Sequence, residues 1–344
     1  MRTTRLRPAR ALFAAAIVLL GLGAGRAATD PPVSSPAAPG PGVATAERDE
    51  PGVPIQLHLG RASTIPFDSP SGLIVLTGRI NGRAQVRLLL DTGDPSGFTL
   101  DDKKARELGL PLTDRTPTRA TGMVGSERFN LYRARVESFL LGGLSARDFS
   151  IWTAPDAALL AKMTGARVDG FVGVDLLRGL HVTLSYPTRQ ITFAPPAAPP
   201  QGQAAPQPPG VPLRLEGNRI VVDVLLDGRE ARPMLIDTAA GATFIAQSDE
   251  ALTRPSPTGA ATQIVDSSGT AISVPIRILP SLAFGGVEVR DVPVVPYDFE
   301  ELRRALFAST SHDVSGILGS DVLSRCVVVL DFPARRLRVT RCGT

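Results

Sequence analysis

An internal repeat is the feature of this sequence that most limits how the chain can fold. An apolar run that ends on Asp-Thr and a small residue occurs at residues 88–93 and again at 234–239, an offset of 146 residues. Two apolar residues followed by Gly occur at 171–173 and at 317–319, again 146 residues apart. One structural module is therefore used twice, and each copy carries one Asp-Thr pair.

The chain is long enough for both copies to fold as domains. With 344 residues, of which 43% are hydrophobic and 5% aromatic, the sequence is typical of globular, strand-rich domains of ordinary size. A Pro-, Ala- and Gly-rich stretch precedes the first copy, and a Pro-rich stretch separates the two copies. We therefore expect a signal peptide at 1–27, a disordered Pro/Ala-rich segment at 28–53, an N-terminal module at 54–195, a Pro-rich linker at 196–211 and a C-terminal module at 212–344.

The N-terminus has the pattern of an export signal. Residues 1–27 contain five arginines and no acidic residue, and an apolar run from Ala11 to about Leu22 precedes the small residues Gly25 and Ala27. This run is short for a membrane span. We expect an exported protein, periplasmic or secreted, with no stable membrane anchor; an uncleaved anchor is the alternative.

Nearly all of the excess positive charge of the chain lies in this N-terminal segment. The whole chain has a formal net charge of +4, but without residues 1–27 it has 32 basic and 33 acidic residues, a net charge of −1. A nearly neutral protein has no electrostatic attraction for a phosphate backbone. Nucleic acid is therefore not an expected partner.

Two cysteines lie near the C-terminus. Cys326 and Cys342 flank two β-rich runs around a Pro-containing turn, so in a hairpin they fall nearly opposite each other. A disulfide there fits an exported protein, and two buried thiols are the alternative. With the cysteines paired and the histidines far apart, the sequence indicates no metal site.

Each copy contains a hairpin that leads to its Asp-Thr pair. Strand-like runs at 72–80 and 86–90 flank the turn dipeptide Asn81-Gly82, and Asp227-Gly228 occupies the same place in the second copy. Residues 101–110 predict a short helix that is closed by Gly. The aspartates are thus expected at equivalent places, each just past the end of a buried strand.

The repeated aspartates carry the candidate chemistry. A single Asp-Thr-Gly is most simply a turn, but here each Asp precedes the Gly of an apolar-apolar-Gly motif by 82 residues, at 91 and 173 and at 237 and 319. If the modules pack about a pseudo-twofold axis, Asp91 and Asp237 come together. Two adjacent carboxylates share one proton, so one can act as a base towards water and the other as an acid towards a carbonyl oxygen.

These motifs resemble those of the retropepsin-like aspartic proteases, in particular exported bacterial aspartyl proteases with two such modules in one chain. The resemblance covers nearly all of residues 70–195 and 212–342. It implies an all-β fold of two retropepsin-like, pepsin-type acid protease lobes related by a pseudo-twofold axis, with few short helices. The expected state is a monomer with an intramolecular pseudo-dimer; pairing of each module with another chain is the alternative.

The resemblance also implies roles for individual residues. Asp91 and Asp237 would be the catalytic pair of an aspartic endopeptidase that acts on peptide or protein substrates without metal or cofactor. Thr92 and Thr238 would exchange hydrogen bonds across the interface. Support for the active-site loops would also come from Gly93 and Ala239, and the flap candidates are Gly122, Gly125, Ser268 and Gly269.

Two departures from the family pattern leave a second function open. Ala239 stands where the family has Gly, which adds a Cβ atom where backbones approach closely. Asp94-Pro95 follows Gly93, and we expect the Asp94 side chain to face solvent. The alternative is a catalytically degenerate peptide-binding or sensing protein on the same fold.

Overall fold

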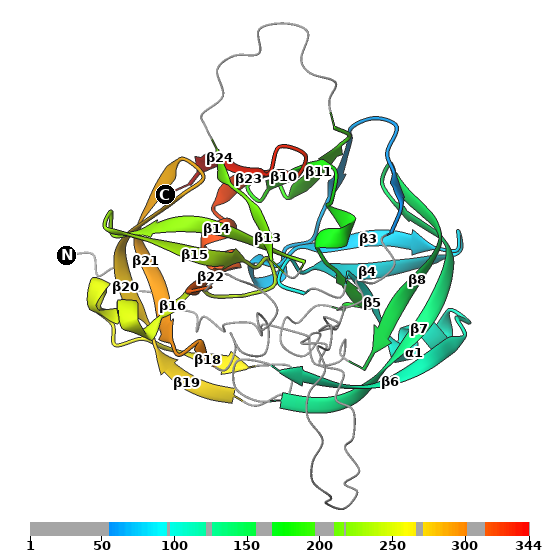
Figure 1. Ribbon diagram of the computed structural model, residues 1–344, viewed down its shortest axis with the longest axis horizontal. Helices are drawn as coiled ribbons and strands as arrows, with labels where there is room; N and C mark the ends of the chain where they lie inside the picture. The colour runs from blue at the N-terminus through cyan, green and yellow to red at the C-terminus, as the bar shows by residue number, and fades with distance from the viewer. Residues whose placement is uncertain are drawn as a thin grey trace, which may run out of the picture.

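The structure is a computed structural model that describes residues 55–94, 97–121, 126–155, 167–196, 210–216, 218–265, 271–300 and 314–343. The chain is mainly β, with few short helices, and forms two pepsin-like lobes joined by a sheet to which both contribute (Figure 1). The predicted signal peptide, the segment at 28–53 and most of the predicted linker lie outside the described residues.

The first lobe is an eight-stranded sheet that closes on itself. Because β8 pairs with both β5 and β7, six of its strands form a ring, in the order β8-β5-β9-β4-β3-β7. The strands, in sheet order, are β1 (Leu57–His58), β8 (Leu144–Ala154), β5 (Phe98–Asp101), β9 (Gly170–Val172), β4 (Ala84–Leu90), β3 (Val75–Ile80), β7 (Ser126–Leu141) and β6 (Leu112–Thr121).

The second lobe repeats this arrangement. Here the additional pairing of β14 with β20 closes a ring of six strands, in the order β14-β15-β22-β16-β21-β20. The strands, in sheet order, are β13 (Arg214–Glu216), β14 (Arg219–Leu226), β15 (Glu230–Ile236), β22 (Gly316–Leu318), β16 (Phe244–Ala246), β21 (Val287–Tyr297), β20 (Arg277–Phe284) and β17 (Arg254–Pro255).

A six-stranded sheet joins the lobes and reveals their symmetry. It contains β12 (Val211–Pro212), β24 (Arg336–Cys342), β23 (Cys326–Asp331), β10 (His181–Ser185), β11 (Gln190–Ala194) and β2 (Ser63–Pro66), in that order. At its centre β10 pairs antiparallel with β23, and Thr183 faces Val329, its own equivalent in the repeat. A residue that pairs with its own equivalent lies on the axis relating the two copies, so the modules pack about a pseudo-twofold axis within one chain.

The two hairpin turns and the helix after the first Asp-Thr loop form where the sequence predicts them. Asn81 and Gly82 have φ angles of 50° and 66°, and Asp227 and Gly228 have 48° and 65°, as a type I′ hairpin turn requires. The helix α1 (Asp102–Glu107) begins after Asp101, whose side chain accepts hydrogen bonds from two backbone N–H groups. Within the described ranges the structure also has the helical segments η1 (Pro70–Gly72), η2 (Val174–Leu176), η3 (Gln247–Leu252) and α4 (Ser320–Leu323), which the sequence analysis did not predict.

One hydrophobic core extends through both lobes. Leu88, Leu90 and Val172 of the first lobe belong to the same buried cluster as Ile236 and Leu318 of the second. Because buried apolar surface stabilises the folded state in proportion to its area, a shared core holds the two lobes in a defined relative position.

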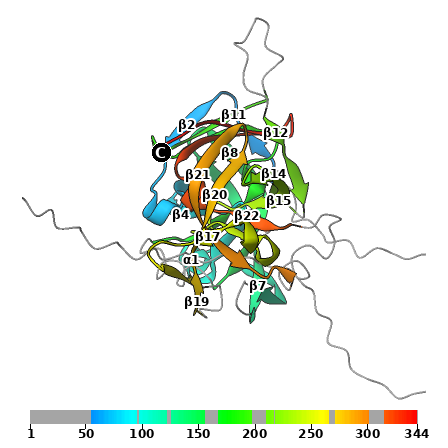
Figure 2. The same cartoon turned by 90° about the vertical axis from the view of Figure 1, so that its left-hand side faces the viewer.

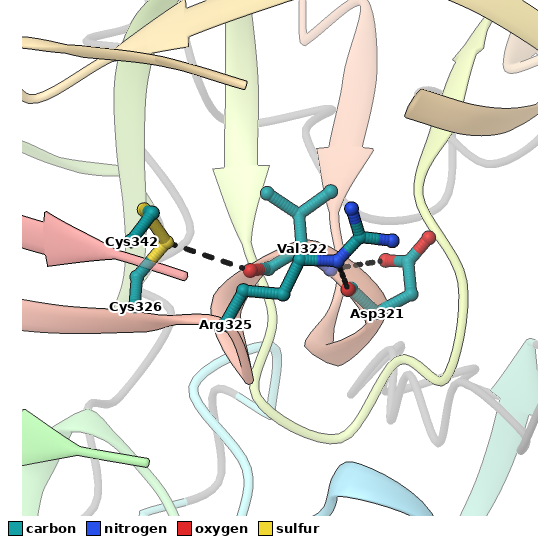
Figure 3. The surroundings of a disulfide bond; sticks show 5 residues. All are labelled: Asp321, Val322, Arg325, Cys326 and Cys342. Carbon is teal, nitrogen blue, oxygen red and sulfur yellow. Dashed lines mark hydrogen bonds between the residues drawn. A yellow bond between two sulfur atoms is a disulfide. The ribbon is translucent and has the colours of Figure 1, made fainter. Parts of the chain in front are cut away.

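The predicted disulfide is confirmed. Cys326 and Cys342 face each other across the β23–β24 hairpin and are bonded, with their Cα atoms 3.9 Å apart. Figure 3 shows that the bond lies beside α4, where the sulfur of Cys326 contacts the carbonyl oxygen of Val322 at 3.6 Å. The bond therefore connects two neighbouring strands of the joining sheet, β23 and β24, next to the segment that follows the second apolar-apolar-Gly motif.

Two hairpins lie on the side of the molecule opposite the joining sheet. One consists of β6 and β7, and the other of β18 (Ala261–Val265) and β19 (Ala271–Pro275). Figures 1 and 2 agree in placing β19 and β7 at one end of the molecule and β11 at the other. No helix in the described part of the chain is both long and apolar enough to cross a membrane.

Candidate active site

Each aspartate follows a central, buried strand of its lobe. Leu88, Leu89 and Leu90 at the end of β4 have no exposed surface, because β4 lies between β3 and the parallel strand β9. The Asp91 backbone N–H then donates to the Val172 carbonyl oxygen at 2.9 Å. β15 and β22 place Asp237 in the same way, with its N–H donating to Leu318 at 3.1 Å.

The two carboxylates are held in the same manner. Asp91 Oδ1 accepts hydrogen bonds from the backbone N–H groups of Gly93 and Asp94, at 2.9 and 3.0 Å. Asp237 Oδ1 accepts them from Ala239 and Ala240, at 2.8 and 2.9 Å. The two Oδ2 atoms are buried, and neither has a hydrogen-bond partner among the described residues. One oxygen of each carboxylate is thus fixed to its loop, and the other makes no hydrogen bond to the described part of the chain.

Two threonines join the loops across the interface. The Thr92 hydroxyl donates to the carbonyl oxygen of Ile236 at 2.6 Å, and the Thr238 hydroxyl donates to that of Leu90 at 2.5 Å. Each hydroxyl oxygen also accepts the backbone N–H of the other threonine, at 3.2 and 3.1 Å. This reciprocal exchange, which the family resemblance implied, fixes the two aspartate loops relative to each other.

The first loop packs tightly against the second at Gly93. A Cβ atom on Gly93 would lie 2.5 Å from Asp237 Oδ2, so a side chain there would require this carboxylate or the loop to move. In the second lobe Ala239 occupies the equivalent position, is 1% exposed, and still donates its N–H to Asp237. The replacement of Gly by Ala thus leaves the hydrogen bond to the carboxylate in place.

Burial and mutual repulsion favour a shared proton on the pair. Burial raises the pKa of Asp237 to about 6, although the N–H groups of Ala239 and Ala240 and the positive charge of Arg219 lower it. The pKa of Asp91 is raised well above its usual value by burial and by the negative charges of Asp237 and Asp94. The pair is therefore expected to hold one proton above about pH 6, where Asp237 has lost its proton and Asp91 has not.

The expectation that Asp94 faces solvent is wrong. Asp94 is 1% exposed, and its charge interacts with that of Arg219 from the second lobe. Arg219 is 3% exposed and donates from Nε to the Gly93 carbonyl oxygen at 2.9 Å. The sequence analysis assigned no role to Arg219. A comparison of the two copies could have found it, because the equivalent residue in the first copy is the apolar Leu73.

The apolar-apolar-Gly motifs support the loops from behind. A Cβ atom on Gly173 would lie 2.6 Å from the carbonyl oxygen of Asp94, so this glycine allows the first loop to pack closely. In the second lobe Asp321 accepts a hydrogen bond from the Thr243 hydroxyl at 2.7 Å, and the Gly319 N–H donates to that hydroxyl at 3.2 Å. The sequence analysis assigned no role to Thr243 or Asp321, although Asp321 repeats Asp175 at the offset of 146 residues.

The remaining predicted site residues lie outside the described part of the chain. These are the four flap candidates, Gly122, Gly125, Ser268 and Gly269. The strands beside them pair as hairpins, with Thr121 opposite Ser126 and Val265 opposite Ala271. Among the described residues no group of three or more His, Cys, Asp and Glu side chains is placed to hold a metal ion.

Comparisons with known proteins agree with this arrangement. The model of the Aspartyl protease family matches the chain twice, at residues 76–176 and 222–322. The crystal structure of an aspartic proteinase from Irpex lacteus is similar at 14% identity and a TM-score of 0.48, over 82% of this chain and 98% of the other. A search of curated proteins found no match. Since the two family matches together span more than half of the sequence, each with its own Asp-Thr loop, the chain belongs to the Aspartyl protease family.

Proposed function

We propose that the protein is an aspartic endopeptidase, which hydrolyses peptide bonds with a water molecule activated between Asp91 and Asp237. The observation that carries this proposal is the state of the two Oδ2 atoms. Both belong to carboxylates whose other oxygen is fixed by backbone N–H groups, and both are buried without a partner among the described residues. A buried carboxylate oxygen of this kind is suited to binding a water molecule and a carbonyl oxygen.

The reaction would proceed by general acid–base catalysis with one proton on the pair. The ionised carboxylate takes a proton from water as the water oxygen bonds to the carbonyl carbon, and the protonated carboxyl gives its proton to the carbonyl oxygen. The resulting tetrahedral diol collapses when the C–N bond breaks: the protonated carboxyl gives its proton to the leaving nitrogen, and the ionised carboxylate takes a proton from one diol hydroxyl, which restores the starting state of the pair. Burial raises the pKa of both carboxyls, so the pair keeps one shared proton, and we assign that proton to the pair and not to either residue alone.

A peptide is the substrate that this arrangement suits best. The two hairpins, β6–β7 and β18–β19, come from equivalent places in the two lobes and lie at the end of the molecule away from the joining sheet. Strands at the rim of a site can hold an extended peptide by backbone hydrogen bonds. We propose that these hairpins are flaps over the substrate, with Gly122 and Gly125 at one tip and Ser268 and Gly269 at the other.

We also propose that the protein acts outside the cytoplasm, in the periplasm or after secretion. This proposal is supported by the arginine-rich and then apolar N-terminal sequence and by the disulfide between Cys326 and Cys342. Fractionation of the cells that make it, followed by detection of the chain and determination of its N-terminal residue, would test both export and the cleavage expected near residue 27.

The direct test of the activity is cleavage of a mixed peptide library from mildly acidic to neutral pH. The chain is assayed beside Asp91→Asn and Asp237→Asn, which keep the shape of the side chain and remove its acid–base function. Cleavage by the wild type that is lost in both variants would support a shared pair. If either variant keeps wild-type activity, the two-carboxylate mechanism is wrong.

The same experiment distinguishes the peptide-binding alternative. A folded wild type that cleaves no peptide would favour the binding or sensing protein, and binding is then measured with a peptide in which a secondary alcohol replaces one carbonyl. Such a compound resembles the tetrahedral intermediate, so an active enzyme should bind it more tightly than the parent peptide. Equal affinity for the two compounds would contradict the catalytic proposal.

A further inference from the structure

Two oppositely charged side chains are buried beside the first aspartate loop. Asp94 belongs to this loop in the first lobe, and Arg219 begins β14 in the second lobe; they are 1% and 3% exposed. Charged side chains are almost never buried to this extent unless other charges or hydrogen bonds compensate them. Their position therefore calls for a physical explanation.

Short contacts connect both residues to the aspartate pair. The Asp94 backbone N–H donates to Asp91 Oδ1 at 3.0 Å, so Asp94 belongs to the loop that holds this carboxylate. Arg219 reaches across the interface to the Gly93 carbonyl oxygen at 2.9 Å. Gly93 in turn abuts Asp237, since a Cβ atom there would lie 2.5 Å from Asp237 Oδ2. A displacement of Arg219 would thus reach both carboxylates through one peptide unit.

The repeat supplies an internal comparison. At the offset of 146 residues, Asp94 corresponds to Ala240 and Arg219 corresponds to Leu73. Both of these apolar residues are fully buried. Both lobes have an Asp-Thr loop, but Asp94 and Arg219 at the first loop are charged, whereas their counterparts Ala240 and Leu73 are apolar. The two positions differ together, which indicates that the charged residues function as a couple.

The two charges act on the aspartates in opposite directions. The negative charge of Asp94 raises the pKa of Asp91 and of Asp237, and the positive charge of Arg219 lowers the pKa of Asp237. Burial lowers the pKa of Arg219 itself to about 10, while the charges of Asp94, Asp91 and Asp237 raise it. Arg219 therefore stays positively charged at neutral and acidic pH. Tyr186, the other titratable group that interacts with Asp237, stays neutral because burial raises its pKa.

We propose that Arg219 and Asp94 are positioning residues that, from one side of the site only, determine how tightly the two aspartates hold their shared proton. In this arrangement Arg219 fixes the Gly93 carbonyl and offsets the third buried carboxylate, so that one of the aspartates can ionise. The effect on catalysis rests on the proposed endopeptidase function. The effect on proton binding does not.

The test replaces the charged residues with the apolar residues of the other lobe. The variants are Asp94→Ala, Arg219→Leu and the double variant, and kcat/KM for a cleaved peptide is measured as a function of pH. Loss of the positive charge in Arg219→Leu should move the profile to higher pH by about one unit, and Asp94→Ala should move it to lower pH by a similar amount. The double variant should return close to the wild-type profile.

Two further variants separate charge from packing. Arg219→Lys keeps the positive charge but loses the Nε donor to Gly93, so kcat should fall while the pH profile stays in place. Arg214→Leu removes an arginine from the neighbouring strand β13, where its ion pair with Asp223 is partly exposed, and should leave the profile unchanged. If Arg219→Leu does not fold, the other two variants still test the proposal. Asp94→Ala should shift the pH profile of kcat/KM, and Arg219→Lys should not.

A second readout needs no catalytic activity. The carboxyl carbons of Asp91 and Asp237 are titrated by NMR in protein labelled with ¹³C-aspartate, and they are assigned with Asp91→Asn and Asp237→Asn. The titration midpoints of these carboxyl carbons should move to higher pH in Arg219→Leu and to lower pH in Asp94→Ala. If the wild type cleaves no peptide but the titrations shift in opposite directions, the proposed function fails and this inference stands. Folded variants that shift in the same direction, or not at all, would overturn it.

Discussion

Gly93 of the first lobe lies against the Asp237 carboxylate of the second lobe, so that a Cβ atom on Gly93 would stand 2.5 Å from Asp237 Oδ2. The equivalent residue in the second lobe, Ala239, already has a Cβ atom and is fully packed. The two aspartate loops therefore make the same hydrogen bonds, but only the loop of the second lobe has room for a Cβ atom after its Asp-Thr pair.

This contact predicts that one methyl group has different effects in the two loops. Gly93→Ala should reduce kcat/KM at least 100-fold, because the new Cβ must displace Asp237 or separate the loops. Ala239→Gly is the matched control and should stay within a few-fold of the wild type, since it only removes a methyl group. Peptide cleavage, with unfolding measured alongside, checks both variants. Equal losses would contradict the asymmetry.

The threonine hydroxyls should contribute strongly to stability. Thr92→Val or Thr238→Val leaves buried backbone groups of the other lobe without their partner, which should lower the free energy of unfolding by about 1–3 kcal/mol. Thr153→Val is the matched control, because the Thr153 hydroxyl is buried without a partner among the described residues. Denaturant unfolding should show little change there. Thr92→Ser, which keeps the hydroxyl, should recover most of the loss.

The buried aspartates predict greater stability at acidic pH than at neutral pH. The folded-state pKa of Asp237, about 6, exceeds the ordinary value of 3.8, so the folded chain binds this proton more tightly than the unfolded chain. Its stabilising effect is complete below pH 3.8 and is lost as the pH rises through about 6. The amount is at most roughly 3 kcal/mol, since one pKa unit corresponds to about 1.4 kcal/mol.

Substitution of Asp237 tests this pH dependence. Asp237→Asn keeps an oxygen for the N–H groups of Ala239 and Ala240 and removes the buried charge. Its free energy of unfolding should therefore exceed that of the wild type at neutral pH and vary less between pH about 4 and 7. Denaturant unfolding at several pH values measures this difference. A variant as pH-dependent as the wild type would show that Asp237 is not the group responsible.

The disulfide should stabilise the sheet between the lobes. Cys326 and Cys342 are 16 residues apart, and closure of a loop of this length corresponds to about 3 kcal/mol. The Cys326→Ala/Cys342→Ala double variant should lose about this amount in guanidinium unfolding. A reducing agent should have the same effect on the wild type and none on the double variant, which separates loss of the bond from other effects of the reagent.

Much of the fold and of the candidate site could be predicted from the repeat. Asn81-Gly82 and Asp227-Gly228 predict their hairpins because few residues adopt the positive φ angles that such turns need. The disulfide followed from the position of Cys326 and Cys342 on either side of one turn. The pairing of the Asp-Thr loops followed from the symmetry that a duplicated module implies, since equivalent residues meet at a twofold axis.

The prediction for Asp94 failed for an equally physical reason. A carboxylate in a loop is expected in water, and local sequence gives no sign of a cation that begins a strand 125 residues further on. Only the packing of β14 against the first loop brings Arg219 to Gly93. Burial of such a charge depends on distant partners, which a motif search within one loop does not consider.

The sequence by itself determined the duplicated module, its β-rich elements, the two Asp-Thr loops and the hairpin disulfide, because these depend on local backbone preferences and on the offset of 146 residues. Only the tertiary structure decided that the two loops meet within one chain, that a side chain on Gly93 would require a carboxylate or a loop to move, and that Asp94 and Arg219 make the site asymmetric. These features depend on contacts between residues far apart in the chain, and such contacts are set by the packing of the lobes about their common axis.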